Sequence, residues 1–206
     1  MALTDPHAPG ATPLTVEQLK GLRNPFITSQ AELNRAEQAN IVRARVWART
    51  ARSIVMPKML SREFLGDLHR RMYADVWTWA GKQRIVDTNI GVDFPKIGVE
   101  LRILFDDARH WLEHGTYPPI EYAVRMHHRL AFIHPFPNGN GRLSRFYADL
   151  VLTRHFKQSP LTWGGGQLGN EDPRRQQYIE ALCAADNHNY FGLIGFATSW
   201  RIVGAS

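Results

Sequence analysis

The stretch "HPFPNGNGRLSR", residues 134–145, combines a histidine, two glycines around an asparagine, and two arginines three positions apart. Pro135 disfavours helical backbone at the residue before it, so a preceding helix is expected to end at His134. Gly139 and Gly141 allow a sharp turn and the close approach of another group. The stretch therefore predicts the end of one helix, a tight turn and the start of a second helix.

The turn leads into "GRLSRFYADLVLTRHF", whose apolar spacing is that of a helix beginning at about Asn140. A helix N-terminus after a glycine turn offers unpaired N–H groups and a positive dipole end, which together bind phosphate. Arg142 and Arg145 are i,i+3 neighbours, so both guanidinium groups can reach one anion. We interpret the stretch as a phosphate-binding cradle with His134 at its edge.

Length and composition predict one globular domain. The chain has 206 residues, 44% of them hydrophobic, which is enough for a sizeable core. The N-terminal "MALTDPHAPGATP" lacks the charged and apolar regions of a secretory signal, and no apolar run reaches membrane-spanning length. The single cysteine, Cys183, excludes an intramolecular disulfide, and its place in a helical pattern predicts a buried side chain. We expect a cytoplasmic protein without a membrane partner.

The formal net charge of +6 raises the question of nucleic-acid binding. The arginines are scattered from Arg23 to Arg201 among acidic residues, however, and form no long basic run. Their excess over lysines favours fixed pairs with carboxylates and phosphates over a diffuse basic surface. We therefore expect a mildly basic, solvated surface and no nucleic-acid partner.

Apolar spacing is mainly helical along the chain, which predicts an all-α fold. Ser29 and Glu32 have the spacing of a capping box, and Ser61 is a candidate N-cap. The segment "QRIVDTNIGVDFP" has β-type residues around an Asn/Gly turn, which predicts a small hairpin over about 84–94. The expected helices span residues 29–50, 61–80, 97–115, 118–134 and 140–156, a segment capped by Asp172 and Pro173, and a last segment from Tyr190.

Three histidines, at positions 127, 128 and 134, are candidates for chemistry. His134 directly precedes the phosphate cradle, which favours the role of general base for a hydroxyl nucleophile. His127 shares a helical face with apolar residues, so we interpret it as a packed side chain. A metal cluster of the three is disfavoured, because adjacent residues such as His127 and His128 point in different directions on a helix.

The motif resembles the signature of the Fic (filamentation induced by cAMP) family, HPFx[D/E]GNGRxxR. The segment "LHRRMYADVWTWAGKQR" resembles the family's upstream segment, and "TSQAELNRAEQANI" and "YIEALCAADNHNYFGLIGF" resemble the subgroup called mobile mystery protein B. The resemblance implies a mainly helical bundle with a small β-hairpin flap. The matching fixed positions of the signature are His134, Pro135, Phe136, Gly139, Asn140, Gly141, Arg142 and Arg145.

The resemblance also implies a reaction, the transfer of AMP from ATP to a Ser, Thr or Tyr hydroxyl of a target protein. In this family the motif histidine deprotonates the hydroxyl, which attacks the α-phosphate, and pyrophosphate leaves. The family binds the α-phosphate at the position of Asn140, forms an anion nest around Gly139 and Gly141, and binds the β- and γ-phosphates through Arg142 and Arg145.

The resemblance further implies how the chain is organised. The hairpin at about 84–94 corresponds to a flap that aligns the target segment by strand addition. Tyr178 stands where some Fic proteins contact the base or ribose of the nucleotide, and packing is the alternative. The expected organisation is an N-terminal extension over 1–28, an N-terminal helix region with an inhibitory role over 29–60, and the Fic domain over 61–203.

Asn138 departs from the signature, which usually has Asp or Glu there to hold Mg²⁺ between the α- and β-phosphates. Asn offers a neutral carbonyl oxygen, whereas Mg²⁺ prefers hard, charged oxygen ligands. Three interpretations stay open: Mg²⁺ held mainly by the nucleotide phosphates, a different nucleotide or transferred group, or a weakly active or inactive protein. We favour the first, with ATP as substrate, Mg²⁺ as cofactor and slow turnover.

Many Fic proteins are inhibited by a helix whose glutamate pairs with the second motif arginine, which is Arg145 here. Leu33, Glu37 and Ile41 are spaced i, i+4, i+8, so Glu37 is expected on the core face, where a carboxylate needs a cationic partner. Glu32 already has a structural role in the capping box. Glu37 is therefore the candidate inhibitory residue, and a purely structural pair with another arginine or with backbone donors is the alternative.

The leading interpretation is a protein nucleotidyltransferase, and two alternatives stay open. The first is a catalytically weak, nucleotide-binding interaction module; the retention of His134 argues against it, because such a module needs no base. The second is a phosphotransferase-like Fic relative in a toxin–antitoxin system, which would have an antitoxin partner.

Overall fold

The computed structural model describes residue 3, residues 13–165 and residues 174–199. Within these ranges the chain consists of helices and loops, and an isolated antiparallel bridge joins Leu22 and Trp77. No described helix is long and apolar enough to cross a bilayer. The helices are α1 Val16–Leu19, α2 Gln30–Thr50, α3 Met56–Met59, α4 Arg62–Tyr73, η1 Phe94–Lys96, α5 Ile97–Glu113, α6 Pro119–Ile133, α7 Asn140–Leu150, η2 Val151–His155, η3 Trp163–Gly165, α8 Arg174–Asp186 and α9 Phe191–Thr198.

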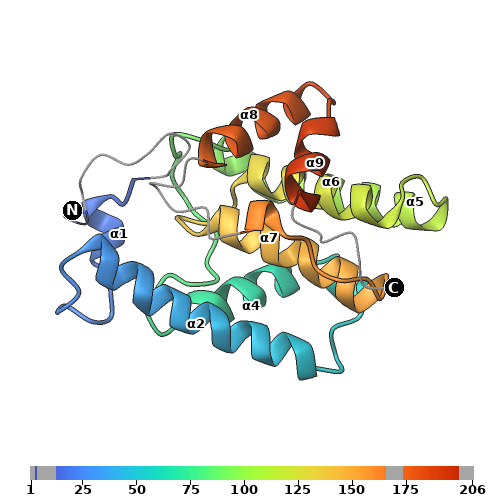
Figure 1. Ribbon diagram of the computed structural model, residues 1–206. Coiled ribbons are helices and arrows are strands. Elements are labelled where there is room, and N and C mark those ends of the chain that lie inside the picture. The colour runs from blue at the N-terminus through green and yellow to red at the C-terminus, as the bar shows by residue number, and fades with distance from the viewer. Residues whose placement is uncertain (1–2, 4–12, 166–173, 200–206) are drawn as a thin grey trace.

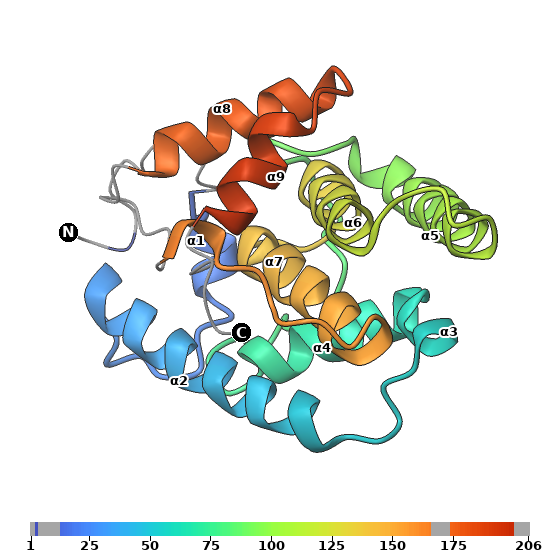
Figure 2. The same cartoon turned by 45° about the vertical axis from the view of Figure 1, so that its right-hand side comes forward.

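Helix α7 runs through the middle of the bundle, as Figure 1 shows. Helix α6 packs along one side of α7 and α4 packs on another, while α2 covers α4 from outside. Helix α5 lies beside α6, and α8 and α9 pack against each other over α6 (Figure 2). Because a short loop joins α6 to α7, residues 134–139 lie at one end of the two central helices.

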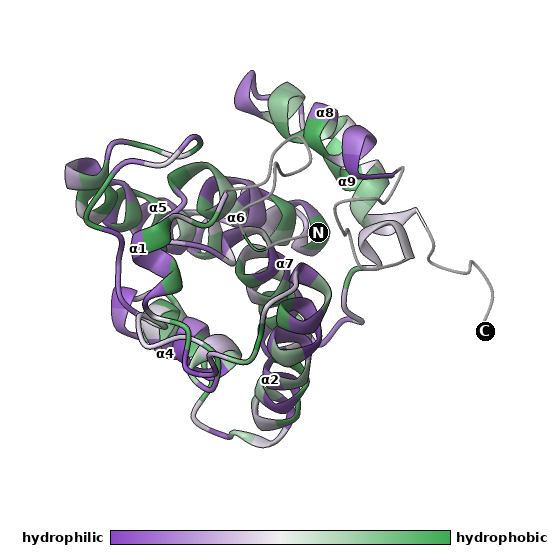
Figure 3. Cartoon of the chain, turned by 90° about the vertical axis from the view of Figure 1, so that its left-hand side faces the viewer, coloured by the Kyte–Doolittle hydropathy of each residue, from purple (hydrophilic) through white to green (hydrophobic). Residues whose placement is uncertain are grey.

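Helix α2 begins where the capping box predicts. The N–H of Glu32 donates to the Ser29 hydroxyl at 3.3 Å, and the N–H of Ser29 donates to the Glu32 carboxylate at 3.0 Å. The turns of α2 alternate between hydrophilic and hydrophobic colours in Figure 3, as expected for an amphipathic helix. The residues it buries, on the face that packs against α4, are Leu33, Glu37, Asn40, Ile41, Ala44 and Ala48.

Helix α4 ends at Tyr73, well before the expected end at residue 80. The backbone beyond it pairs instead with the N-terminal segment: the N–H of Thr78 donates to the Gly21 carbonyl at 2.9 Å, and that of Arg23 donates to the Val76 carbonyl at 2.9 Å. These bonds use backbone groups that a longer helix would need for itself. The described part of the expected extension 1–28 is thus packed directly onto the helical domain.

The C-terminal helices follow the sequence pattern with two differences. The motif helix reaches His155 as expected, but its last five residues form a π-helix. The expected cap at residues 172–173 lies outside the described residues. The side chain of Cys183 is exposed, so the expectation of a buried cysteine is wrong. The cause is that α8 buries its opposite side, through Tyr178, Ala181 and Ala185.

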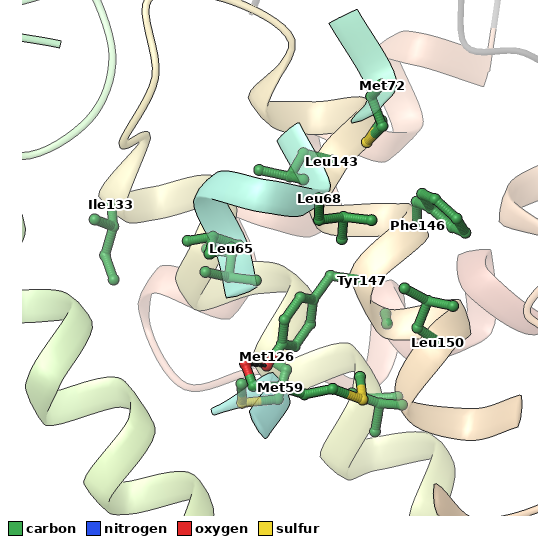
Figure 4. Close-up of a cluster of buried hydrophobic side chains, with 14 of the residues drawn as sticks. Met59, Leu65, Leu68, Met72, Met126, Ile133, Leu143, Phe146, Tyr147 and Leu150 are labelled. Atoms are coloured by element: carbon green, nitrogen blue, oxygen red, sulfur yellow. Dashed lines mark hydrogen bonds between the residues drawn. The ribbon is translucent and has the colours of Figure 1, made fainter. Parts of the chain in front are cut away.

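The core forms where α4, α6 and α7 meet, as Figure 4 shows. Fully burying one large apolar side chain stabilises a fold by about 1.5–3 kcal/mol. The hydroxyl of the buried Tyr147 donates to the Met59 carbonyl at 2.8 Å, so this polar group has a hydrogen-bond partner inside the core. The labelled members are Met59, Leu65, Leu68, Met72, Met126, Ile133, Leu143, Phe146, Tyr147 and Leu150.

The predicted β-hairpin at 84–94 is not seen, since this described segment contains bends and no strand. Its β-type residues suggested pairing across an Asn/Gly turn. In the structure, two carbonyls of this segment accept hydrogen bonds from a side chain instead. The buried guanidinium of Arg84 donates to the carbonyl of Val86 at 3.0 Å and to that of Val92. A side chain from the start of the segment therefore joins its two halves, in place of a strand ladder. We call residues 84–94 the flap segment.

Candidate active site

His134 ends helix α6 in a left-handed backbone conformation, with a φ of 54°. Its N–H donates to the Leu130 carbonyl at 3.1 Å, and its Nδ1 lies 3.2 Å from the Ala131 carbonyl oxygen. Because a carbonyl only accepts, Nδ1 carries the proton, and in the neutral ring Nε2 has the lone pair. The helix end predicted from Pro135 is confirmed, and Nε2 is the nitrogen that can accept a proton.

The environment of His134 keeps its ring neutral. Burial lowers the pKa of His134 to about 4; the hydrogen bond to Ala131 opposes this shift, and the positive charge of Arg84 adds to it. The imidazole is therefore uncharged near pH 7 and able to act as a base. A buried neutral histidine beside an anion-binding turn is a suitable arrangement for accepting a hydroxyl proton.

Asn140 closes the turn between α6 and α7 from inside. Its Oδ1 accepts from the N–H of Phe136 at 2.9 Å, and its Nδ2 donates to the Phe136 carbonyl at 2.8 Å. An amide group has a second Nδ2 hydrogen, which these two bonds leave unassigned. The buried Asn140 side chain thus shapes the loop, a role that the sequence reasoning did not assign to it.

Gly139 is the N-cap of α7 and has a φ of 79°, in the left-handed region. A Cβ at this position would lie 2.6 Å from the ring of Tyr73, so only glycine fits. The Tyr73 hydroxyl donates to the Gly139 carbonyl at 3.3 Å, which fixes the turn from below. Gly141 follows in the first turn of α7, where a Cβ would meet nothing closer than Arg145 Nη1 at 3.7 Å. The predicted turn and helix start are confirmed.

His69 supports the loop and was missed by the sequence reasoning. The N–H of Gly81 donates to its Nδ1 at 2.9 Å, so Nε2 carries the proton and donates to the Asn138 carbonyl at 3.0 Å. Its ring stacks on Phe136 with centroids 4.0 Å apart. Burial lowers the pKa of His69 to about 3, so it stays neutral. The signal in the sequence that could have indicated this role was the histidine itself, which lies on the buried face of α4.

The side-chain oxygen of Asn138 is used within the loop. Its Oδ1 accepts from the N–H of Gly139 at 2.6 Å. In the part of the chain that the structure describes, no three or more His, Cys, Asp or Glu side chains converge in a way that could hold a metal ion. The described residues therefore do not fit a Mg²⁺ site formed by protein ligands, and we derive no step through Mg²⁺.

Glu37 lies in the site, but its partner is not the expected one. Its Oε2 lies 2.6 Å from Nη2 of Arg142, the first motif arginine, whereas the family resemblance implied a pair with Arg145. Its Oε1 accepts from the indole N–H of Trp77 at 2.7 Å. Both carboxylate oxygens are thus satisfied in a buried position.

Arg145 and Tyr178 lie together on the other side of α7. The Arg145 guanidinium carbon is 5.4 Å from the centre of the Tyr178 ring. The Tyr178 hydroxyl and His127 Nε2 are 3.0 Å apart, and both residues are buried. His127 is therefore packed, as predicted. His128 faces elsewhere, with its Nε2 2.9 Å from Oδ1 of Asp186, so the adjacent histidines have different partners.

Comparisons with known proteins agree with this arrangement. Residues 59–152, which include α4, the flap segment and the whole motif, match the model of the Fic/DOC family. Over these residues the chain is similar to the Fic/DOC family. A protein adenylyltransferase Fic from Drosophila mojavensis is 32% identical over 106 residues, which cover 50% of this chain and 21% of that relative. This match thus spans about a fifth of the length of the relative.

Solved structures of Fic proteins share the fold of most of this chain. Fic-1 of C. elegans (residues 134–508) superposes with a TM-score of 0.64 at 23% identity, covering 89% of this chain and 54% of that one. The N-terminal Fic domain of a putative cell filamentation protein from Bartonella quintana, solved with bound ADP, gives a TM-score of 0.61 at 16% identity, covering 84% and 86%. At these identities the likeness establishes the fold.

Proposed function

We propose that this protein transfers AMP from ATP to a hydroxyl group of a protein. The observation that carries the proposal is the pairing of a neutral, buried His134 with a glycine turn at the N-terminus of α7. In the reaction, His134 Nε2 takes the proton of a Ser, Thr or Tyr hydroxyl. The hydroxyl oxygen forms a bond to the α-phosphorus, the bond from that phosphorus to the bridging oxygen breaks, and pyrophosphate leaves with both electrons of that bond.

The phosphates have a defined place in this proposal. The Gly139 N–H already donates to Asn138 Oδ1, so we assign the α-phosphate to the backbone N–H of Gly141, the positive end of α7 and the second Nδ2 hydrogen of Asn140. Arg142 and Arg145 bind the β- and γ-phosphates and stabilise the charge that develops on pyrophosphate. The work is mostly positioning and charge stabilisation, which suits a rigid loop held by several buried side chains.

The comparisons support the adenine nucleotide and the protein target. A relative named protein adenylyltransferase matches half of the chain, and a Fic domain of the same fold was solved with ADP. Tyr178 borders Arg145, so we assign it a position beside the nucleotide, where its buried ring supports the guanidinium of Arg145. The flap segment aligns the target's backbone beside His134.

We further propose that α2, in the region 29–60, restrains the domain formed by residues 61–203. Glu37 occupies the guanidinium of Arg142, which ATP phosphates need. A nucleotide must therefore break a buried, charge-assisted hydrogen bond before it can bind productively. This contact differs from the expected one at Arg145, and it acts on the arginine nearer to the turn. We also propose that the chain belongs to the Fic subgroup called mobile mystery protein B.

The experiment that tests the function uses ATP labelled at the α- or the γ-phosphate. Wild-type protein is incubated with each nucleotide, and labelled protein, including the enzyme itself, is detected on a gel. Transfer of the α-label alone supports AMP transfer; transfer of the γ-label means phosphorylation, and no transfer favours a binding module. His134→Ala should abolish labelling, and His114→Ala, which changes an exposed histidine at the end of α5, should not.

A further inference from the structure

The Arg84 guanidinium is almost completely buried, with 2% of the residue exposed, and it is surrounded by backbone carbonyls. Its Nε donates to the His134 carbonyl at 2.7 Å, and its Nη2 lies 3.5 Å from that of Ile133. Its Nη1 and Nη2 donate to the carbonyls of Val86 and Val92 in the flap segment. One side chain therefore joins the end of α6 to both halves of the flap segment.

Further contacts make this junction rigid. The N–H of Arg84 donates to the Pro135 carbonyl at 3.0 Å, so its backbone is fixed to the motif loop as well. Gly91, at the far turn of the flap segment, has a φ of +106°, and a Cβ there would lie 2.6 Å from the Cβ of His134. The same Cβ would lie 2.9 Å from Arg84 Nη2. The flap segment thus contacts His134 directly, with no space for an additional methyl group.

The charges around Arg84 favour a buried cation at this position, and this cation in turn affects the His134 ring. The carbonyls of Ile133 and His134 are at the negative end of the α6 dipole, which favours a cation there. Oδ1 of Asp87, on the flap segment, lies 3.6 Å from Nη1 of Arg84. The negative charge of Asp93 also interacts electrostatically with Arg84. Burial is the main cause of the lowered pKa of His134, and the positive charge of Arg84 lowers this pKa further.

We propose that Arg84 is a positioning residue that fixes the flap segment to the backbone of His134, so that a target segment lying along the flap is placed relative to Nε2. This inference rests on the proposed transfer to a protein hydroxyl. Arg84 touches neither the nucleotide nor the hydroxyl. It holds the left-handed conformation of His134, which is otherwise unfavourable for a residue with a Cβ. The flap position and the base position are therefore set together.

Two substitutions separate the geometric part of this role from the electrostatic part. Arg84→Lys keeps a positive charge, but a single ammonium group cannot bond carbonyls on both halves of the flap segment and on α6. Arg84→Met keeps the length of the side chain and removes both the charge and the hydrogen bonds. Arg62→Met is the matched control, because Arg62 donates to Gln83 at 3.1 Å beside the flap segment without contacting His134.

The first experiment does not depend on transferase activity. We measure the titration of the His134 ring by NMR and the hydrogen exchange of amides 85–93 in each variant. Arg84→Lys should speed exchange across the flap segment and leave the His134 pKa near that of the wild type. Arg84→Met should speed exchange and also raise the His134 pKa, while Arg62→Met changes neither. Unchanged exchange and an unchanged pKa in folded Arg84→Met would overturn the proposal.

The second experiment measures the kinetics of α-label transfer. Arg84→Lys should lower kcat/KM for the protein acceptor by about a hundredfold, as expected for a misplaced catalytic group. Its KM for ATP should stay within about twofold, because the phosphate loop is intact. If Arg84→Lys lost both ATP binding and transfer, this result would contradict a role in positioning the flap segment. If wild-type protein transfers nothing, the proposed function fails, and the NMR experiment still decides the role of Arg84.

If Arg84→Met does not fold, Gly91→Ala provides an independent test of the same junction. The added methyl group must displace the flap segment from His134, because the Cβ-to-Cβ separation would be 2.6 Å. Faster exchange of amides 85–93 and a lower kcat/KM for the protein acceptor, with ATP binding retained, support the proposal. Exchange and kcat/KM equal to those of the wild type would overturn it.

Discussion

Replacing Glu37 should activate the protein, and two substitutions at this position show why. Glu37→Gln keeps the size of the side chain and an oxygen for the indole N–H of Trp77, but it removes the negative charge from Arg142. Glu37→Gly removes the whole side chain. If the carboxylate competes with nucleotide phosphates for Arg142, both variants should bind ATP more tightly and label more protein than the wild type.

The size of the effect follows from the contacts. A hydrogen bond to a charged group contributes about 1.5–3 kcal/mol, and about 1.4 kcal/mol corresponds to a tenfold change in an equilibrium constant. The Arg142 side chain is 33% exposed, so water screens part of its pair with Glu37 and the lower half of that range applies. ATP binding in Glu37→Gln should therefore tighten by roughly tenfold to thirtyfold.

The assay combines calorimetric titration with ATP and labelling with α-labelled ATP at a nucleotide concentration below the wild-type Kd. Glu32→Gly is the matched control, because Glu32 completes the capping box of the same helix and lies outside the site. It should lower the free energy of unfolding, because the capping box is lost, and leave ATP affinity unchanged. Unchanged ATP affinity and labelling in both Glu37 variants would refute the reasoning and remove α2 as an inhibitor.

Three other predictions use single groups. Because the pKa of His134 is about 4, the labelling rate should be constant above about pH 5.5 and fall as pH drops toward 4 and the base is protonated; a midpoint near 6.5 would contradict the buried neutral ring. Asn138→Asp restores a charged oxygen and should tighten Mg²⁺ binding and raise transfer; equal or lower transfer at saturating Mg²⁺ would mean that Asn138 suits other chemistry. Burial raises the pKa of Asp149 to about 6 although it accepts from Trp163 and Leu161, so ionising it costs stability as pH rises from 4 to 6. Asp149→Asn should raise the thermal midpoint at pH 8 relative to the wild type and lose this advantage at pH 4; no pH-dependent difference would contradict the raised pKa.

Local rules predicted the parts of the fold that depend on neighbouring residues. Pro135 and Gly139 were sufficient to place the end of α6 and the start of α7, because each restricts its own stretch of backbone. Ser29 was sufficient to place the start of α2 for the same reason. In these cases, the residues that determine the structure lie within four positions of one another.

Contacts between distant segments were not predictable in this way. The helix expected over residues 61–80 ends early because the backbone of Thr78 pairs with that of Gly21. The flap segment forms no hairpin because the Arg84 guanidinium joins its two halves. The position of Glu37 on the buried face followed from helical spacing. Its pairing with Arg142 instead of Arg145 depends on how α2 docks, which spacing does not specify.

The most direct test of the central claim compares two proteins, Glu37→Gly and the double variant Glu37→Gly/His134→Ala. Both lack the restraining carboxylate, so both should bind ATP with similar affinity. The reasoning predicts strong transfer of the α-label, with release of pyrophosphate, by Glu37→Gly and loss of that transfer in the double variant. Equal labelling by the two proteins, at equal ATP affinity, would show that His134 is not the base and would contradict the proposed reaction.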